Sequence, residues 1–149
     1  MSKAEAFFSK KEEKQIISAI KKAENNTSGE IRIHIDESSD SDCLVRAKQA
    51  FITLKMDKTK NRNGVLLYIS AIEKEFAICG DVGIDKLTSA DFWEEIKDVV
   101  LLHFKKNEFV MGLTKGIEMV GDSLRKYFPF EDDDIDELPD EISYEGKAK

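Results

Sequence analysis

The fold of this chain is decided by residues 63–83, which read NGVLLYISAIEKEFAICGDVG. Residues 65–69 are apolar without alternation, a pattern typical of a strand that is covered on both faces. The link at 71–74 is too short for a crossover, so the apolar run at 76–79 should fold back as the second strand of an antiparallel hairpin. This places the Val65 strand in the centre of a sheet.

The residues before the hairpin predict a strand, a helix and a parallel connection. Isoleucines alternate with polar residues through 31–36, which indicates a half-exposed strand near the sheet edge with His34 on its solvated face. Helical spacing follows over residues 42–56. Because strand–helix–strand connections are right-handed crossovers, the strand at 31–36 should lie parallel to the Val65 strand.

Three more helices are expected around this sheet. Ser9 and Glu12 form a capping box at the start of the first helix, and Thr88 and Asp91 form one at the start of another. A last helix is expected from about residue 108 to residue 127. The predicted fold class is α/β, with a small mixed sheet of three to four strands, a parallel crossover and an antiparallel hairpin, flanked by helices on both faces.

The charge of the chain divides it into two parts. Its 149 residues suit one domain, assigned to residues 1–130, followed by an acidic tail at 131–149 that is partly docked or disordered. The tail carries nine acids and two lysines, which accounts for the whole net charge of -7, and the body holds 21 acidic and 21 basic residues. A neutral body without a basic patch argues against nucleic-acid binding.

The same composition bears on location. No apolar run approaches the roughly 20 residues of a membrane-spanning helix, and the amino terminus lacks the apolar core of a signal peptide. Cys43 and Cys79 fall within predicted elements and are typical of small buried hydrophobes in a reducing compartment. The sequence therefore predicts a cytoplasmic protein with no membrane partner.

Three short polar segments next to the predicted strands suggest a binding site. Residues 27–30 and 61–64 precede two of the strands and residues 80–85 follow the third, so the topology brings them to one edge of the sheet. Carboxylate and amide oxygens are the ligands of hard cations, and Ca²⁺ accepts six to eight of them. The predicted metal ligands are Glu30, Asn63, Asp81 and Asp85.

Plain turn chemistry explains the same residues differently. Gly80 and Gly83 are then present for a positive φ in a tight turn, and Asp81 caps that turn. In this interpretation Glu30 forms an ion pair with Arg62 across the edge.

A second location is the crevice beyond the carboxyl ends of the parallel strands, where ligands of open α/β sheets usually bind. The acids predicted there are Asp36, Glu37, Asp40 and Asp42. They lie in a Ser/Asp-rich loop, for which a solvated loop is the preferred interpretation. No nucleophile elbow, phosphate-binding loop or dinucleotide fingerprint is present, so no catalytic nucleophile is named.

With these segments identified, the chain resembles the TPM domain family, which includes thylakoid-lumen phosphatases and many bacterial proteins. The resemblance rests on residues 27–32, 62–67 and 80–84 and continues through Phe104 and the helix near residues 112–113. It covers roughly residues 10–128. The tail, at 134–140, also looks like that of the stand-alone soluble bacterial members.

The resemblance implies an α/β sandwich with calcium, or another divalent ion such as Mg²⁺, bound among the loops. By position Glu30, Asn63, Asp81 and Asp85 match the polar edge residues of the family, although relatives often carry Glu where this chain has Asp85. Asp91 is not carried over as a ligand, because it already has a place in a capping box.

Three functions are weighed from these observations. The first is a calcium-binding module with the ion held at the loop edge. The second, implied by the activity of some relatives, is a metal-assisted acid phosphatase in which Arg62 clamps the phosphate, and whether the chain is an enzyme stays open. The third is a protein-interaction module in which the acidic tail recruits a basic protein partner.

Overall fold

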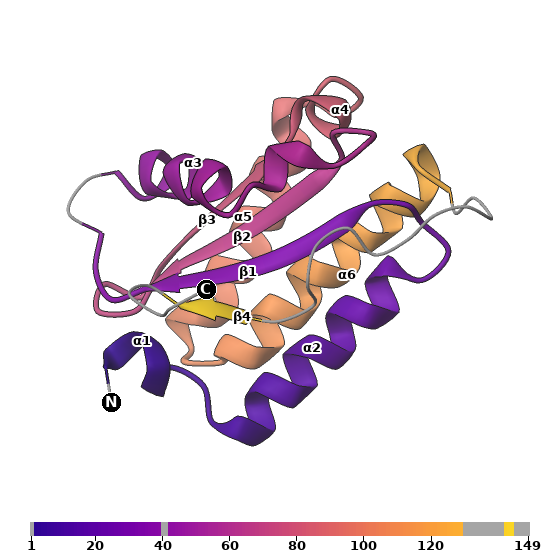
Figure 1. The fold of residues 1–149 in the computed structure, drawn as a ribbon. Coiled ribbons are helices and arrows are strands. Elements are labelled where there is room, and N and C mark those ends of the chain that lie inside the picture. Colours follow the sequence, from indigo (N-terminus) through magenta and orange to yellow (C-terminus); the bar gives the residue numbers. More distant parts are fainter. Residues whose placement is uncertain (1, 40–41, 130–141, 145–149) are drawn as a thin grey trace.

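The computed structural model of the chain describes residues 2–39, 42–129 and 142–144 (Figure 1). Its helices are α1 (Lys3–Ala6), α2 (Lys10–Glu24), α3 (Cys43–Thr53), the 3-10 turn η1 (Met56–Lys58), α4 (Val82–Asp85), α5 (Ala90–Lys105) and α6 (Phe109–Tyr127). Its strands are β1 (Glu30–Asp36), β2 (Gly64–Ser70), β3 (Glu75–Gly80) and β4 (Ile142–Tyr144).

The strands form one mixed sheet in the order β3-β2-β1-β4. β1 and β2 are parallel, with Glu30 opposite Gly64, and β2 and β3 form an antiparallel hairpin with Val65 opposite Gly80. The predicted α/β fold, with its parallel crossover, its hairpin and β2 between two neighbours, is confirmed.

The prediction of a half-exposed β1 with a solvated His34 is wrong. All seven residues of β1 are buried, and His34 is only 7% exposed. The reason is that β4 pairs in parallel with β1, so that Ile33 lies opposite Ile142 and β1 becomes an interior strand. His34 therefore bonds to Ser143 and Asp36 instead of water.

Helices cover both faces of the sheet. Figure 1 shows α2 and α6 below it and α3 above. The lower core joins the isoleucines of β1 to apolar residues of α2, α5 and α6, among them Ile16, Ile20, Ile96, Val100, Ile117 and Leu124. The upper core is smaller and packs Ala47 and Phe51 of α3 on Leu66 and Tyr68 of β2.

One of the two predicted capping boxes is confirmed. The Glu12 N–H donates to Ser9 Oγ over 3.1 Å, and the Ser9 N–H donates to the Glu12 carboxylate over 2.8 Å. The second prediction is wrong, because α5 is capped by Ser89, whose Oγ accepts from the Phe92 N–H over 3.3 Å. Thr88 serves the preceding helix instead, donating to the Ile84 carbonyl.

Part of the acidic tail predicted for residues 131–149 forms β4. The other tail residues lie outside the described part of the chain, and so does Asp40 of the second predicted cation location. Within the described part, no helix combines the length and apolarity needed to cross a bilayer.

Candidate functional site

The amino ends of β1 and β2 and the end of β3 meet at one edge of the sheet. The Glu30 N–H donates to the Asn63 carbonyl over 3.4 Å, and the Asp81 N–H donates to the Gly64 carbonyl over 2.9 Å. Three of the four predicted ligands, Glu30, Asn63 and Asp81, therefore lie on neighbouring strand ends. We call these residues, together with Arg62, the polar edge.

The three predicted ligands of the polar edge are buried although they are hydrophilic. Glu30 is 2%, Asn63 1% and Asp81 5% exposed. A buried carboxylate is costly unless a cation or hydrogen-bond donors compensate for its lost hydration. The Asn63 amide group donates to Ser28 Oγ over 3.4 Å, which links the loop before β2 to the loop before β1.

Arg62 supplies the compensating charge for Asp81. Its Nε donates to Asp81 Oδ2 over 2.7 Å and its Nη2 donates to Asp81 Oδ1 over 2.8 Å, so the pair is bidentate. The hydrogen bond to Asp81 raises the pKa of the Arg62 guanidinium. The Asp81 side chain is 4% exposed and that of Arg62 is 46% exposed. The anion is thus fixed inside the protein, and its counter-charge lies at the surface.

Asp81 also begins α4, as turn chemistry predicted. Its Oδ1 accepts from the Val82 N–H over 2.7 Å. The two glycines beside it provide space and do not supply a positive φ, so the prediction of a positive φ is wrong. A Cβ on Gly83 would lie 2.2 Å from the Asn61 carbonyl oxygen, and one on Gly80 would lie 2.6 Å from the Trp93 ring.

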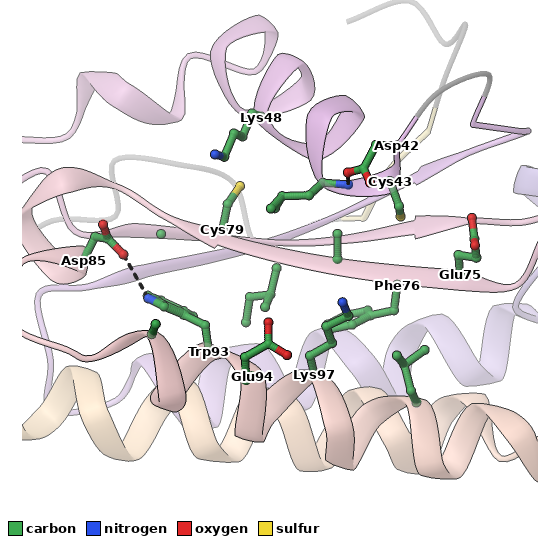
Figure 2. A pocket seen from close by; sticks show the side chains of 16 residues that line it. Asp42, Cys43, Lys48, Glu75, Phe76, Cys79, Asp85, Trp93, Glu94 and Lys97 are labelled. Atoms are coloured by element: carbon green, nitrogen blue, oxygen red, sulfur yellow. Dashed lines mark hydrogen bonds between the residues drawn. The ribbon is translucent and has the colours of Figure 1, made fainter.

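Asp85, the fourth predicted ligand, lies at the end of α4 and is bonded to α5. Its Oδ1 accepts a hydrogen bond from Trp93 Nε1 over 3.0 Å, which ties α4 to α5 (Figure 2). Across the described residues, no three acidic, histidine or cysteine side chains form a ready-made metal cluster. The oxygen donors at the polar edge suit a hard cation in kind, and the Arg62 guanidinium already neutralises Asp81 among them.

At the opposite end of the parallel strands, the described acids are bound into the fold. Asp36 is 0% exposed and is not part of a solvated loop, contrary to the sequence prediction. It accepts from His34 Nε2 over 2.7 Å, from Arg46 Nη2 over 2.9 Å and from the Tyr68 hydroxyl. Burial raises the pKa of Asp36, but these hydrogen bonds outweigh the effect, so its pKa is lowered overall.

The neighbours of Asp36 have structural tasks of their own. Glu37 accepts from the Ala4 N–H over 2.9 Å, which ties α1 to the end of β1. Asp42 caps α3 by accepting from the Leu44 N–H over 2.9 Å. These contacts explain the two acids without a ligand.

A groove that the sequence did not predict runs along β3. It has a volume of about 750 Å³ and lies between α3 on one side and α5 on the other (Figure 2). Both cysteines line it, and burial raises the pKa of the Cys43 and Cys79 thiols to about 12. The sequence does contain a signal for this groove. In the predicted sheet β3 pairs with β2 alone, so its other side is expected to be open.

The family comparison covers most of the chain. A family model described as TPM domain matches residues 1–123. None of the curated proteins compared with the chain matches it.

Solved structures show similar folds. The NMR structure of the BA42 protein from the psychrophilic bacterium Bizionia argentinensis is 49% identical, with a TM-score of 0.86, and the match covers 93% of this chain and 95% of that one. The N-terminal domain of a protein from P. gingivalis has 17% identity and a TM-score of 0.68, covering 83% and 82%. The N-terminal domain of the cg2496 protein from Corynebacterium glutamicum has 15% identity and a TM-score of 0.62, covering 78% and 74%. The last two similarities concern the fold alone.

Proposed function

The chain belongs to the TPM domain family, and from this premise we propose that it is a calcium-binding module whose ion binds at the polar edge. The proposed ligands are Glu30, Asn63 and Asp81 of the polar edge, together with Asp85 of α4, which would give up its hydrogen bond to Trp93 to bind the ion. The observation that carries the proposal is the burial of Glu30 and Asp81 at one sheet edge, each at 5% exposure or less. Oxygen donors gathered in this way are the ligand type that Ca²⁺ and Mg²⁺ require.

Arg62 has a defined part in this proposal. Its guanidinium already neutralises Asp81 and competes with a metal ion for the same carboxylate oxygens. Because the Arg62 side chain is 46% exposed, it has room to leave Asp81 for solvent when a divalent ion arrives. A bound ion supplies positive charge that offsets the repulsion between carboxylates and joins the loops that carry them.

The first test is a titration of the metal-stripped protein with Ca²⁺, followed by amide NMR and calorimetry, with Mg²⁺ as the comparison ion. We expect saturable shifts near residues 30, 63 and 80–85. Asp81→Asn should weaken calcium binding at least about tenfold, because it removes a charged ligand. Arg62→Gln should strengthen it about fivefold, because it removes the internal competitor.

The control is Lys58→Gln, which also removes one positive charge close to this loop. Lys58 is 73% exposed and pairs with Asp57, so its removal should change calcium affinity less than about twofold. Unchanged calcium affinity in Asp81→Asn would refute the proposed site. Weaker binding in Arg62→Gln would show that the arginine assists the ion instead of competing with it.

A metal-assisted phosphomonoesterase is the second candidate. The observation in its favour is the partly exposed Arg62 guanidinium at the polar edge, which suits a phosphate group. The same Arg62→Gln variant separates the two functions. The enzyme hypothesis predicts loss of metal-dependent hydrolysis of p-nitrophenyl phosphate in this variant, whereas the binding module predicts tighter calcium binding.

Recruitment of a basic partner by the acidic tail remains a prediction. Apart from β4, the tail lies outside the described residues.

A further inference from the structure

β3 is the outermost strand on its side of the sheet, and it carries mainly apolar residues. Among the described residues its one neighbour in the sheet is β2, and its sequence after Glu75 is Phe-Ala-Ile-Cys-Gly. Edge strands of this kind offer a row of backbone donors and acceptors to another strand. Proteins that bind peptides by strand addition use such an edge.

The pairing with β2 identifies which backbone groups face outward. The Asp81 N–H donates to the Gly64 carbonyl, so Gly64 and Asp81 form a hydrogen-bonded pair of the antiparallel ladder. Such pairs alternate along a hairpin, and the next ones are Leu66 with Cys79 and Tyr68 with Ala77. The N–H and C=O groups of Phe76 and Ile78 therefore point away from β2, toward the open side of the strand.

The groove of about 750 Å³ follows this open side (Figure 2). Its α3 wall contains Cys43 and Lys48, and its α5 wall contains Trp93, Glu94 and Lys97. An extended chain between these walls would direct successive side chains toward α3 and α5 in turn. The space and the backbone edge are thus available at the same place.

The charges along the groove indicate what kind of chain it fits. Its described lining includes four carboxylates, those of Asp42, Glu75, Asp85 and Glu94, and two ammonium groups, those of Lys48 and Lys97. Figure 2 places Asp85 toward one end of the groove and Asp42 and Glu75 toward the other. Asp85 at one end and Asp42 and Glu75 at the other complement basic residues at the two ends of a bound peptide, and Glu94 on the α5 wall adds a further negative charge between them.

We propose that β3 binds an extended peptide segment of a partner protein by strand addition, with apolar residues at its centre and basic residues at its ends. A second copy of the chain fits less well, because its own α3 and α5 flank its β3 and would meet the helices that wall this groove. A single extended segment carries no such helices. This inference does not rest on calcium binding, because the peptide would contact the backbone of β3. The two proposals share one residue, Asp85, which is a proposed ligand and also lines one end of the groove.

The test uses the peptide acetyl-KVTVTVK-amide, which has high strand propensity and a basic residue at each end. The comparison peptide has the same sequence but is N-methylated throughout its central residues, which removes backbone donors and keeps the side chains. Titration into the full-length ¹⁵N-labelled protein should give saturable amide shifts in β3 and in the groove-facing residues of α3 and α5. The methylated peptide should give none.

Hydrogen exchange provides a more specific reading. The outward N–H groups of Phe76 and Ile78 should exchange at least about tenfold more slowly when the peptide is bound. The N–H groups of Ala77 and Cys79 already bond to β2, so their exchange should change much less. This two-residue period distinguishes strand addition from contact with the groove walls alone.

Two adjacent residues of α5 form a matched pair for the charge argument. Glu94 lines the groove, whereas Glu95 is exposed and is not part of the groove lining. Glu94→Lys should weaken binding of the basic peptide about fivefold, and Glu95→Lys should change it less than about twofold.

Four results would overturn the proposal. They are no saturable binding, equal binding of the methylated peptide, equal effects of the two lysine variants, and protection of Phe76 and Ile78 that rises with protein concentration in the absence of peptide. The last result would assign the edge to a second copy of the chain.

Discussion

Asp36 is a fully buried carboxylate that three different elements hold in place. His34 of β1, Arg46 of α3 and Tyr68 of β2 all donate to it. A charge in this position is stable only while these donors stay in place, since removing one partner of a buried pair leaves the rest uncompensated. Asp36 therefore links α3 to the two central strands through hydrogen bonds.

We predict that Asp36→Asn lowers the free energy of unfolding by about 3 kcal/mol at pH 7. The pKa of Asp36 is lowered in the folded state, so its contribution is fully present above the unfolded pKa of about 3.9 and is lost as the pH falls through the folded pKa. Urea unfolding of both proteins should thus show a difference that narrows below about pH 4. Asp122→Asn is the control, because Asp122 is 77% exposed and its replacement should change stability by less than about 0.5 kcal/mol. An equal difference between wild type and Asp36→Asn at pH 7 and pH 3 would contradict the assignment.

For single residues, the sequence predicts well which polar side chains lie close together. It predicts less well which groups each of them is bonded to. The meeting of Glu30, Asn63 and Asp81 follows from strand direction alone. The partner of Asp81 does not, because it depends on loop conformation, and Arg62 has a left-handed φ of 51°. Alternation predicts an exposed face for His34, yet its Nδ1 shares a 2.8 Å hydrogen bond with Ser143, a residue of the distant strand β4.

The packing of helix α2 against helix α6 depends on a glycine, Gly121, at the point of contact. A Cβ on Gly121 would lie 2.8 Å from Ala23 Cβ and 3.0 Å from the Ala23 carbonyl oxygen. The neighbouring atoms belong largely to the backbone of α2, which cannot move aside as a flexible side chain can.

Gly121→Ala should therefore destabilise the protein, by about 1–2 kcal/mol, despite alanine's helix preference of about 1 kcal/mol over glycine. Thermal and urea unfolding measure the change. Lys115→Ala, at an exposed position of the same helix, should stay within about 0.5 kcal/mol of wild type. A stabilised Gly121→Ala would mean that the two helices have room to separate.

β4 is the element that turns β1 into an interior strand. Ile142 is only 8% exposed, and Ser143 Oγ lies within hydrogen-bond distance of both His34 and the Ile33 carbonyl. We predict that a chain ending at residue 141 is less stable than one ending at residue 144 by about 2 kcal/mol or more, the order expected for burial of one isoleucine side chain. Urea unfolding of the two truncated proteins isolates the three strand residues. Equal stabilities would show that β4 does not protect β1 in solution.

The sequence predicts the other elements better than it predicts β4, for a physical reason. β1, β2 and β3 are six or seven residues long, and their apolar residues allow each strand to be predicted from the sequence. The short link at 71–74 allows only a hairpin between β2 and β3. β4 has three residues inside an acidic segment and forms only because β1 offers an open edge. The sequence does not predict α4, and for this reason Thr88, which bonds to the Ile84 carbonyl of α4, reads as the cap of the next helix.

For the molecule as a whole, the two ends of the parallel strands differ in how their carboxylates are neutralised. At the carboxyl end, Asp36 is bound by several donors and stays part of the fold. At the polar edge, Asp81 has a surface cation, Arg62, as its ion-pair partner. In the proposed calcium-bound state, a divalent ion takes the place of that cation beside Asp81. Because the site would exist only in the folded chain, calcium binding should raise the free energy of unfolding.

We predict that Ca²⁺ at about one hundred times its dissociation constant raises the free energy of unfolding by about 2.7 kcal/mol. Arg62→Gln should be less stable than wild type without calcium, because Asp81 stays buried without its ion pair. It should gain more from the same calcium concentration, because no guanidinium competes for the ligand. Thermal unfolding in chelator and in calcium measures both quantities. In Asp81→Asn, whose calcium affinity should be at least about tenfold weaker, the calcium increment should fall to about 1.4 kcal/mol or less. If the increment in Arg62→Gln equals that of wild type, the arginine and the ion do not share a site, and the calcium would have to bind elsewhere than at Asp81.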